Sequence, residues 1–314
     1  RSRGLGDVYK RQLMKALAPS LEQNSRSTHL DFIMNLSALP MQDRPDSEVG
    51  GHWLLARVGK KVLRPGGLEL TNQMVQAADV RGKDIVELAP GLGLTAQLLT
   101  EQGPKSYTGV DEDPDATAST TEALTELTAS MTAENSSAVS TTIPEIAMVT
   151  ANAKSTGLPD SSVDVVFGEA MLTMHGEKAK SAIMAEAFRI LRPGGKYVIH
   201  ELCLEPDTLA DEDKLEIRRA LAKSIRVNAR PLTTEEWDQL GRDAGFTVAE
   251  HHYADMALLK PKRNLQDEGI KGVLRIAFNL IRMPDARKRV LNMRSVFNKY
   301  SDHLQAIGVV LEKA

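Results

Sequence analysis

The stretch from Asp84 to Thr95 places an apolar strand directly before a glycine-containing loop, and this order constrains the fold more than any other feature of the chain. The loop reads Ala89-Pro-Gly-Leu-Gly93, with small residues at alternate positions. Small residues let the backbone approach a ligand closely, and a following helix presents unpaired N–H groups and a partial positive charge to it. The stretch therefore predicts a site for a nucleotide-like ligand at a strand end.

Downstream of Lys83, apolar runs alternate with helical patterns. This alternation is typical of an α/β fold in which helices cover both faces of a mostly parallel sheet. We predict seven strands in one sheet, at residues 84–89, 106–111, 146–150, 163–168, 196–202, 246–253 and 306–313. Helices are predicted at residues 92–102, 113–131, 178–191 and 234–244, with Thr233 as N-cap and Gly245 as stop of the last.

The remaining segments define the predicted domain organisation. Residues 1–13 lack an initiating methionine and an apolar period, and we interpret them as an adaptor-like, non-native leader. A helical lead-in covers 14–82, and the core covers 83–255 with a helical insertion at 205–230. A further helical insertion covers 256–303, and 304–314 form the final strand of the core. Because ligands bind beyond the carboxyl ends of parallel strands, the three helical additions are predicted to be substrate walls.

Two predicted strands end near acidic residues, Glu87 and Asp111. An acid at the end of the second strand is well placed to accept hydrogen bonds from two ribose hydroxyls. The loop also satisfies a loose dinucleotide pattern from Gly91 to Ala96. Glu87 separates the two interpretations, because its carboxylate would repel a pyrophosphate but would tolerate a cationic cofactor without phosphates. A sulfonium ligand fits better.

At these residues the sequence resembles the class I S-adenosylmethionine-dependent methyltransferases, in particular the small-molecule group called methyltransferase type 11. Glu87-Leu-Ala-Pro-Gly-Leu-Gly93 resembles the acid-x-Gly-x-Gly-x-Gly loop of that family, and Asp111 matches its ribose-binding acid. Asn152-Ala153, followed by Gly157-Leu-Pro-Asp160, resembles the stretch whose first pair contacts adenine. Arg189-Ile-Leu-Arg-Pro-Gly-Gly195 matches the helix exit before the fifth strand.

The resemblance implies a Rossmann-like sheet with an antiparallel last strand and S-adenosylmethionine as cofactor. The cofactor-binding residues it implies are Glu87, Ala89, Gly91, Gly93, Asp111, Asn152, Ala153 and Glu169. Ala89 replaces the first loop glycine, which is acceptable if that position needs a small residue rather than a positive φ. Asn152 replaces an aspartate, and its side-chain oxygen can still accept a hydrogen bond from an adenine amino group.

Four side chains near strand ends are candidates for a general base, namely Glu169, His175, His200 and Glu201. A base is optional, because positioning supplies much of the acceleration when a nucleophile attacks the sulfonium carbon in line. His200 and Glu201 point to opposite faces of a regular strand, so only one of them faces the pocket. Glu169 has a second interpretation, which is to hold the cofactor's amino group.

Composition limits the partners of the chain. Cys203 is the single cysteine, so neither a disulfide framework nor a cysteine metal cluster can form, and no metal site is predicted. The net charge of -3 gives no case for nucleic acid. No apolar run approaches the roughly 20 residues of a membrane span and no signal peptide is visible, so we expect a cytoplasmic location.

Two further sequence features bear on later findings. Residues 256–300 combine an apolar helical face with basic residues, for which we favour a lid or a homodimer contact over contact with an anionic membrane. The pentapeptide Leu-Arg-Pro-Gly-Gly occurs at 63–67 and again at 191–195, and we interpret both copies as turn chemistry.

These observations predict a methyltransferase that moves the methyl group of S-adenosylmethionine to a small-molecule acceptor, such as a thiol or sulfide, a phenol or a quinone, and releases S-adenosylhomocysteine. Two alternatives stay open. One is a catalytically inactive cofactor-binding protein with a regulatory or structural role, because a fold resemblance cannot establish chemistry. The other is an NAD(P)-dependent oxidoreductase.

Overall fold

A computed structural model describes residues 44–134 and 143–314. Residues 1–43, which contain the predicted leader and part of the helical lead-in, lie outside that range. The strands are β1 (Asp84–Leu88), β2 (Ser106–Asp111), β3 (Glu145–Thr150), β4 (Val163–Glu169), β5 (Leu191–Leu204), β6 (Leu232–Thr233), β7 (Phe246–Asp255) and β8 (Leu304–Lys313). The sheet order is β3-β2-β1-β4-β5-β8-β7, with β6 paired to β5 outside this path.

The predicted α/β sheet is confirmed, including its antiparallel last strand. Strands β1 to β5 pair in parallel, whereas β8 runs antiparallel to both β5 and β7. The sequence-based prediction missed one strand, β6, which pairs with Cys203 and Leu204 of β5. A strand of two residues is too short to show a period of two, so no pattern could have revealed it.

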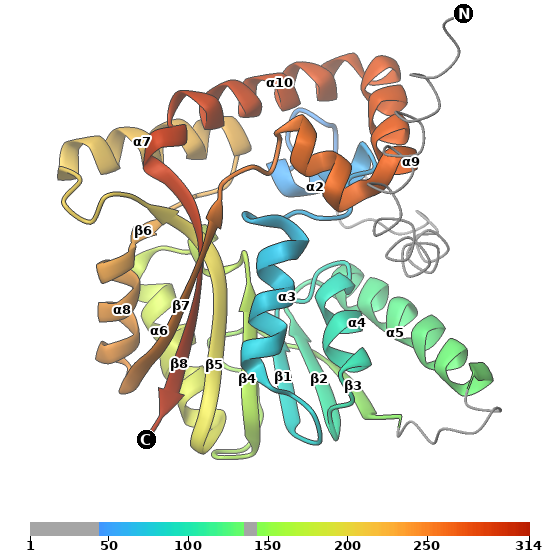
Figure 1. Ribbon diagram of the computed structural model, residues 1–314, viewed down its shortest axis with the longest axis vertical. Coiled ribbons are helices and arrows are strands. Elements are labelled where there is room, and N and C mark those ends of the chain that lie inside the picture. The colour runs from blue at the N-terminus through green and yellow to red at the C-terminus, as the bar shows by residue number, and fades with distance from the viewer. Residues whose placement is uncertain (1–43, 135–142) are drawn as a thin grey trace, which may run out of the picture. The chain divides into compact units, whose positions relative to one another are not determined.

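Helices cover both faces of this sheet (Figure 1). Helices α3 (Gly67–Ala78), α4 (Leu94–Glu101) and α5 (Pro114–Glu134) pack on one face, and α6 (Glu177–Ile190) and α8 (Thr234–Asp243) pack on the other. Strand β1 shows how the apolar residues of one strand are divided between the two faces. Ile85 belongs to the cluster with α3, α4 and α5, while Val86 and Leu88 belong to the cluster with α6 and α8, because alternate side chains point to opposite faces.

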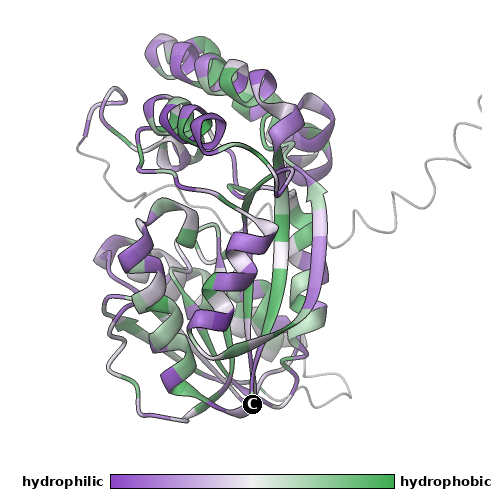
Figure 2. Ribbon diagram, turned by 90° about the vertical axis from the view of Figure 1, so that its left-hand side faces the viewer, coloured by the Kyte–Doolittle hydropathy of each residue, from purple (hydrophilic) through white to green (hydrophobic). Residues whose placement is uncertain are grey.

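Four further helices, here called the cap helices, are α2 (Gly51–Arg57), α7 (Asp211–Ile225), α9 (Pro261–Arg282) and α10 (Pro284–Lys299). They lie together beyond the carboxyl ends of the parallel strands (Figure 1). Hydrophilic and hydrophobic bands alternate along the helices at the top of Figure 2, and the buried apolar sides form a third cluster with the ends of β5 and β8. Within the described ranges, no helix has the length and apolar character that a membrane span requires.

Candidate functional site

The chain turns sharply where β1 ends. Ala89 has a φ of 55°, Gly91 a φ of 60° and Gly93 a φ of 76°. The condition under which alanine would replace the loop glycine without strain is not met, because Ala89 adopts the left-handed region that normally favours glycine. That conformation costs a residue with a Cβ about 1–2 kcal/mol, and such strained positions concentrate at functional sites.

A cavity of about 340 Å³ opens above this turn and is here called the cofactor cavity. Its volume lies within the range of small-molecule sites. The lining includes most of the predicted cofactor residues, namely Glu87, Ala89, Gly91, Asp111, Asn152, Ala153 and Glu169. Gly93 is not among the lining residues. A Cβ on Gly93 would lie 3.1 Å from Thr120 Cα, so this glycine allows α4 to approach α5 closely.

Asp111 closes one side of the cofactor cavity at the end of β2. Its Oδ2 accepts a hydrogen bond from Gly91 N at 3.3 Å, and its Oδ1 accepts one from Asp113 N at 3.0 Å. Burial raises the pKa of Asp111 despite these two hydrogen bonds. The carboxylate therefore joins the glycine loop to the second strand and still borders the cavity.

Glu87 is a buried acid at the floor of the cofactor cavity. Tyr107 donates a hydrogen bond to Glu87 Oε2 at 2.6 Å. Burial raises the pKa of Glu87 to about 8, and the hydrogen bond from Tyr107 only partly opposes that rise. A cationic ligand in the cavity would favour the ionised carboxylate and lower this pKa again.

Asn152 stands at the rim, after β3. Its Nδ2 donates a hydrogen bond to Glu112 Oε2 at 2.5 Å, and its Oδ1 accepts one from Lys154 N at 3.0 Å. The amide oxygen keeps a second lone pair for a ligand. The structure therefore places Asn152 and the neighbouring Ala153 at the cavity with one acceptor position open.

Glu169, at the end of β4, is held by four donors. Its Oε1 accepts from Thr71 Oγ1 and lies 2.5 Å from His200 Nδ1, and its Oε2 accepts from Thr95 Oγ1 and Arg64 Nη1. Burial would raise the pKa of Glu169, but the charge of Arg64 and the contacts with His200 outweigh it and lower the pKa to about 2. A carboxylate with this many partners has no position left to accept a proton from a substrate, so the candidate role as base does not fit.

Arg64 is the site residue that sequence reasoning missed. It lines the cofactor cavity, and its Nη1 is bound to Glu169 and Thr95. Its Nε and Nη2 are buried and have no hydrogen-bond partner among the described residues. These two nitrogens lie on one edge of the guanidinium, which is the edge that binds carboxylates through two parallel hydrogen bonds.

The sequence carried no signal for Arg64. The second copy of its pentapeptide places Arg192 at the protein surface, where it forms ion pairs with Asp84 and Asp164. The same five residues therefore serve two different environments, and only the tertiary structure distinguishes them.

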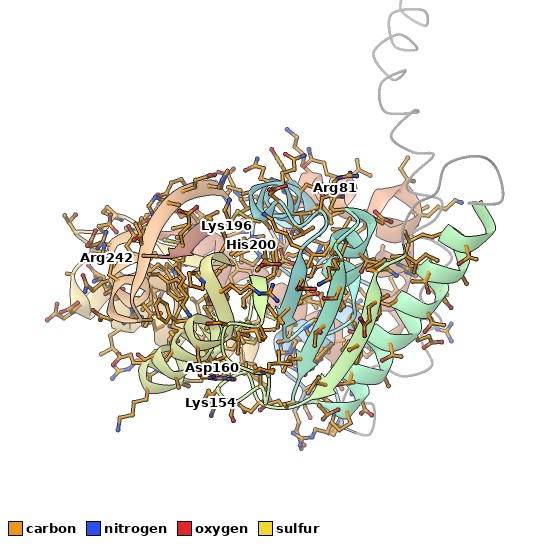
Figure 3. The ribbon with its side chains drawn as sticks, turned by 90° about the horizontal axis from the view of Figure 1, so that it is seen from below. Arg81, Lys154, Asp160, Lys196, His200 and Arg242 are labelled. Atoms are coloured by element: carbon orange, nitrogen blue, oxygen red, sulfur yellow. The ribbon has the colours of Figure 1, made fainter. Side chains whose placement is uncertain are left out.

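His200 and Glu201 lie on opposite faces of β5, as predicted, and both are engaged. His200 Nε2 lies 2.5 Å from Pro65 O and Nδ1 faces Glu169, so neither ring nitrogen is available to a substrate. Figure 3 labels His200 toward the middle of the view, in contrast to the exposed Asp160 and Lys154 at its rim. Glu201 accepts hydrogen bonds from Met171 N, Leu172 N and Thr173 N. The candidate role as base fits neither residue.

His175 is the one sequence-predicted candidate that fits the role of base. It lines the cofactor cavity, and desolvation by burial is the main cause that lowers its pKa, so the imidazole is neutral near pH 7. Among the described residues it has no side-chain hydrogen bond. His52 and Trp53 of α2 also line the cavity, and a Cβ on Gly91 would lie 3.9 Å from Trp53 Cη2, so the indole covers the glycine loop.

Comparison with known proteins by sequence gives a family match and similar proteins. The profile of a family described as a methyltransferase domain matches residues 86–199. An uncharacterised protein of Haemophilus influenzae is 33% identical over 264 residues, which cover 84% of this chain and 98% of that protein.

Solved structures share the fold at lower identity. The [4+2]-cyclase SpnF matches with a TM-score of 0.62 and 15% identity, over 88% of this chain and 99% of that one. Phosphoethanolamine N-methyltransferase 2 of Haemonchus contortus, solved with phosphomonomethylethanolamine and S-adenosylhomocysteine, matches with a TM-score of 0.59 and 15% identity, over 87% and 59%. One is named a cyclase and the other a methyltransferase, so the fold alone does not determine the reaction. Together with the cavity at the strand ends, these findings show that residues 86–199 form a methyltransferase domain and that the chain has the fold of the class I S-adenosylmethionine-dependent methyltransferases.

Proposed function

We propose that the protein transfers the methyl group of S-adenosylmethionine to a small-molecule acceptor and releases S-adenosylhomocysteine. The observation that carries this proposal is the unpaired Nε–Nη2 edge of Arg64, buried beside a cavity that also contains the acids Glu87 and Asp111. S-adenosylmethionine carries a carboxylate that Arg64 can bind. It also carries cationic groups and ribose hydroxyls, which the two acids can bind. A dinucleotide would place a pyrophosphate near two buried carboxyl groups.

The residues of the chain fit the cofactor part by part. Arg64 would hold the carboxylate, Glu87 would face the cationic part, Asp111 would accept from the ribose hydroxyls, and Asn152 with Ala153 would contact the adenine. Glu169 acts on none of these groups directly. It orients Arg64, because it binds Nη1 and leaves the opposite edge free.

When bound, S-adenosylmethionine supplies an electrophilic methyl carbon on a positively charged sulfur. The protein must then exclude water and hold the acceptor in line with that carbon. Of the four candidates predicted from the sequence, His175 is the one whose neutral ring borders the cavity without a side-chain hydrogen bond among the described residues.

The proposal is tested by calorimetry with both cofactor forms and by methyl transfer to a panel of thiols, phenols, quinols and amines. Micromolar binding that Asp111→Ala abolishes, together with a methylated product, is expected. Binding without any product would support the inactive cofactor-binding alternative. A spectroscopic response to reduced nicotinamide cofactor, without binding of S-adenosylhomocysteine, would support the oxidoreductase alternative.

We further propose that the outer face of α9 joins two copies of the chain. Ile270, Leu274, Phe278 and Ile281 recur at helical spacing on this face, with exposed fractions of 71%, 64%, 56% and 70%. Sedimentation velocity should show a dimer that Phe278→Asp converts to a monomer. A monomeric wild type would contradict the dimer, and flotation of the protein with anionic vesicles would assign the face to a membrane surface instead.

A further inference from the structure

A second cavity, of about 100 Å³, lies between the cap helices and the sheet and is here called the apolar chamber. It shares His52, Leu63, Ala170 and Met174 with the lining of the cofactor cavity, so the two cavities meet at these residues. Residues from α2, from the ends of α7 and β5, and from α10 complete its walls.

The chamber is almost entirely hydrocarbon. No lysine or arginine occurs among its lining residues in the part of the chain that the structure describes. The one acidic residue, Glu201, has its carboxylate occupied by backbone N–H groups of the loop after β4 and by Thr173 Oγ1. A phosphate or carboxylate entering here would lose its hydration without gaining a counter-charge.

His52 is the polar group at the junction of the two cavities. Its ring packs against Trp53, with the ring centroids 4.8 Å apart, and its nitrogens have no hydrogen-bond partner within the described ranges. Burial lowers the pKa of His52 to about 4, so the ring is neutral and offers one acceptor and one donor nitrogen. His175, by contrast, lines the cofactor cavity only.

We infer that the apolar chamber is the acceptor subsite, and that it takes a small, mostly hydrocarbon molecule whose single uncharged nucleophilic group meets His52. This inference rests on the proposed methyl transfer. It assigns the acceptor contact to His52 and excludes phosphorylated acceptors of the kind named for the structural neighbour from Haemonchus contortus.

The reaction balances with the groups present. A lone pair of the acceptor oxygen, nitrogen or sulfur forms the new bond to the methyl carbon, and the electron pair of the broken carbon–sulfur bond stays on the cofactor's sulfur. The proton of the acceptor passes to the free nitrogen of His52. Because the pKa of that ring is low, the imidazolium returns the proton readily to water.

The chamber is tested with 4-alkylphenols of increasing chain length, compared with phosphoethanolamine and 4-hydroxybenzoate. Each added methylene should lower KM by about threefold to fourfold until the chamber is filled. The two charged compounds should not be methylated. Val227→Asp, in the chamber wall, should raise KM for 4-butylphenol at least tenfold and leave the affinity for S-adenosylhomocysteine within twofold.

Leu215→Asp is the matched control, because Leu215 is 46% exposed on α7 and lines neither cavity. Leu215→Asp should change neither the KM for 4-butylphenol nor the affinity for S-adenosylhomocysteine. Calorimetric titration of 4-butylphenol into the complex with S-adenosylhomocysteine tests the chamber without turnover, and Val227→Asp should weaken that binding as well.

His52→Gln separates hydrogen bonding from a structural role. It should reduce kcat at least tenfold for 4-butylphenol, because the amide of glutamine can accept a hydrogen bond but cannot take up the proton, and it should leave the affinity for 4-butylphenol in the complex with S-adenosylhomocysteine within about threefold. An unchanged kcat, or a loss of affinity as large as the loss of kcat, would overturn the assignment of His52. Turnover of phosphoethanolamine without turnover of alkylphenols would overturn the chamber and leave methyl transfer intact. Absence of both cofactor binding and methyl transfer would remove the proposed function itself.

Discussion

Arg64 and Glu169 form a buried ion pair although 105 positions of sequence separate them. The pair joins the segment before α3 to the carboxyl end of β4. Thr95 and His200 bind the same carboxylate, so the guanidinium is fixed in one plane with its Nε–Nη2 edge unpaired. Glu169, an acid at a strand end, therefore positions Arg64 so that the arginine can bind a carboxylate.

Replacing Arg64 should weaken binding of the amino acid part of the cofactor. Arg64→Met is expected to reduce the affinity for S-adenosylhomocysteine by about 10-fold to 100-fold, because a charged hydrogen-bonded pair contributes about 1.5–3 kcal/mol. Calorimetry measures the loss. Arg64→Lys should restore only part of it, because an ammonium cannot offer two parallel donors.

5′-Methylthioadenosine is the control ligand for this substitution, because it lacks the amino acid carboxylate. Its affinity should be unchanged in Arg64→Met. An equal loss for both ligands would show that the substitution disturbs the cavity as a whole, and it would remove the carboxylate-binding role.

Cofactor affinity should depend on pH through Glu87. Burial raises the pKa of Glu87 to about 8 without a ligand, and a cation lowers it, so binding releases a proton below that pH. The affinity for S-adenosylmethionine should therefore rise from pH 6 to pH 8 and then level off. Titrations across this range, compared with Glu87→Gln, test the assignment, since the variant should show a flatter profile.

Glu169 should contribute to stability above pH 4.5 and lose that contribution in acid. Its pKa is lowered from 4.5 to about 2 in the folded state, so the unfolded chain binds the proton first as the pH falls from 4.5 to 2. Thermal melts should show a shallower acid limb for Glu169→Gln. That variant should also lose about 3–5 kcal/mol at pH 7, because it leaves Arg64 buried without its counter-charge.

Glu268 of α9 should hold the segment that carries Leu63 and Arg64. Its carboxylate accepts hydrogen bonds from Lys61 N at 2.9 Å and from Val62 N at 3.0 Å, and it forms a buried ion pair with Lys60. Glu268→Gln should increase the rate of amide hydrogen exchange at residues 60–64 by at least tenfold. It should also raise the KM for S-adenosylmethionine and for the methyl acceptor.

Glu250→Gln is the matched control for Glu268, because the side chain of Glu250 is 51% exposed on β7. It should leave exchange at residues 60–64 unchanged. If Glu268→Gln also leaves exchange at residues 60–64 unchanged, α9 does not hold the segment that carries Arg64.

Ala89 should tolerate glycine but not a β-branched residue. Because its φ is 55°, Ala89→Gly relieves left-handed strain and should raise the free energy of unfolding by up to about 1 kcal/mol. Ala89→Val should lower it and weaken binding of S-adenosylhomocysteine at least tenfold. Denaturant titrations measure the free energy of unfolding of the two variants, and calorimetry measures their affinity for S-adenosylhomocysteine. If Ala89→Val changes neither quantity, the turn is not constrained.

The residues that line the cavity at the strand ends could be picked out from the sequence because they are local. The loop from Glu87 to Gly93, the acid Asp111 and the pair Asn152-Ala153 each lie at the end of a recognisable strand, and parallel strands bring their carboxyl ends to one edge. The cavity there is lined by these residues except Leu88, which packs in the core, and Gly93, which supports helix packing. The left-handed turn at Ala89 was not predictable, because alanine rarely adopts it.

The choice among candidate bases could not be made from the sequence. Glu169, His200 and Glu201 stand at strand ends as a base would, but each is occupied by partners distant in the chain. Arg64 and His52, in contrast, lie in no motif that indicates a ligand-binding role. Their importance comes from polar atoms that lack partners in the described structure, which is a property of packing and not of composition.

The sequence by itself determined the parallel sheet, the cofactor edge and the presence of helical additions, because strand periodicity and loop chemistry act over a few residues. Only the tertiary structure decided what those additions build. Helices from three separate segments pack together beyond the strand ends, enclose an apolar chamber and place His52 where it meets the cofactor cavity. Such long-range packing depends on how surfaces fit across the whole chain, and no local pattern records it.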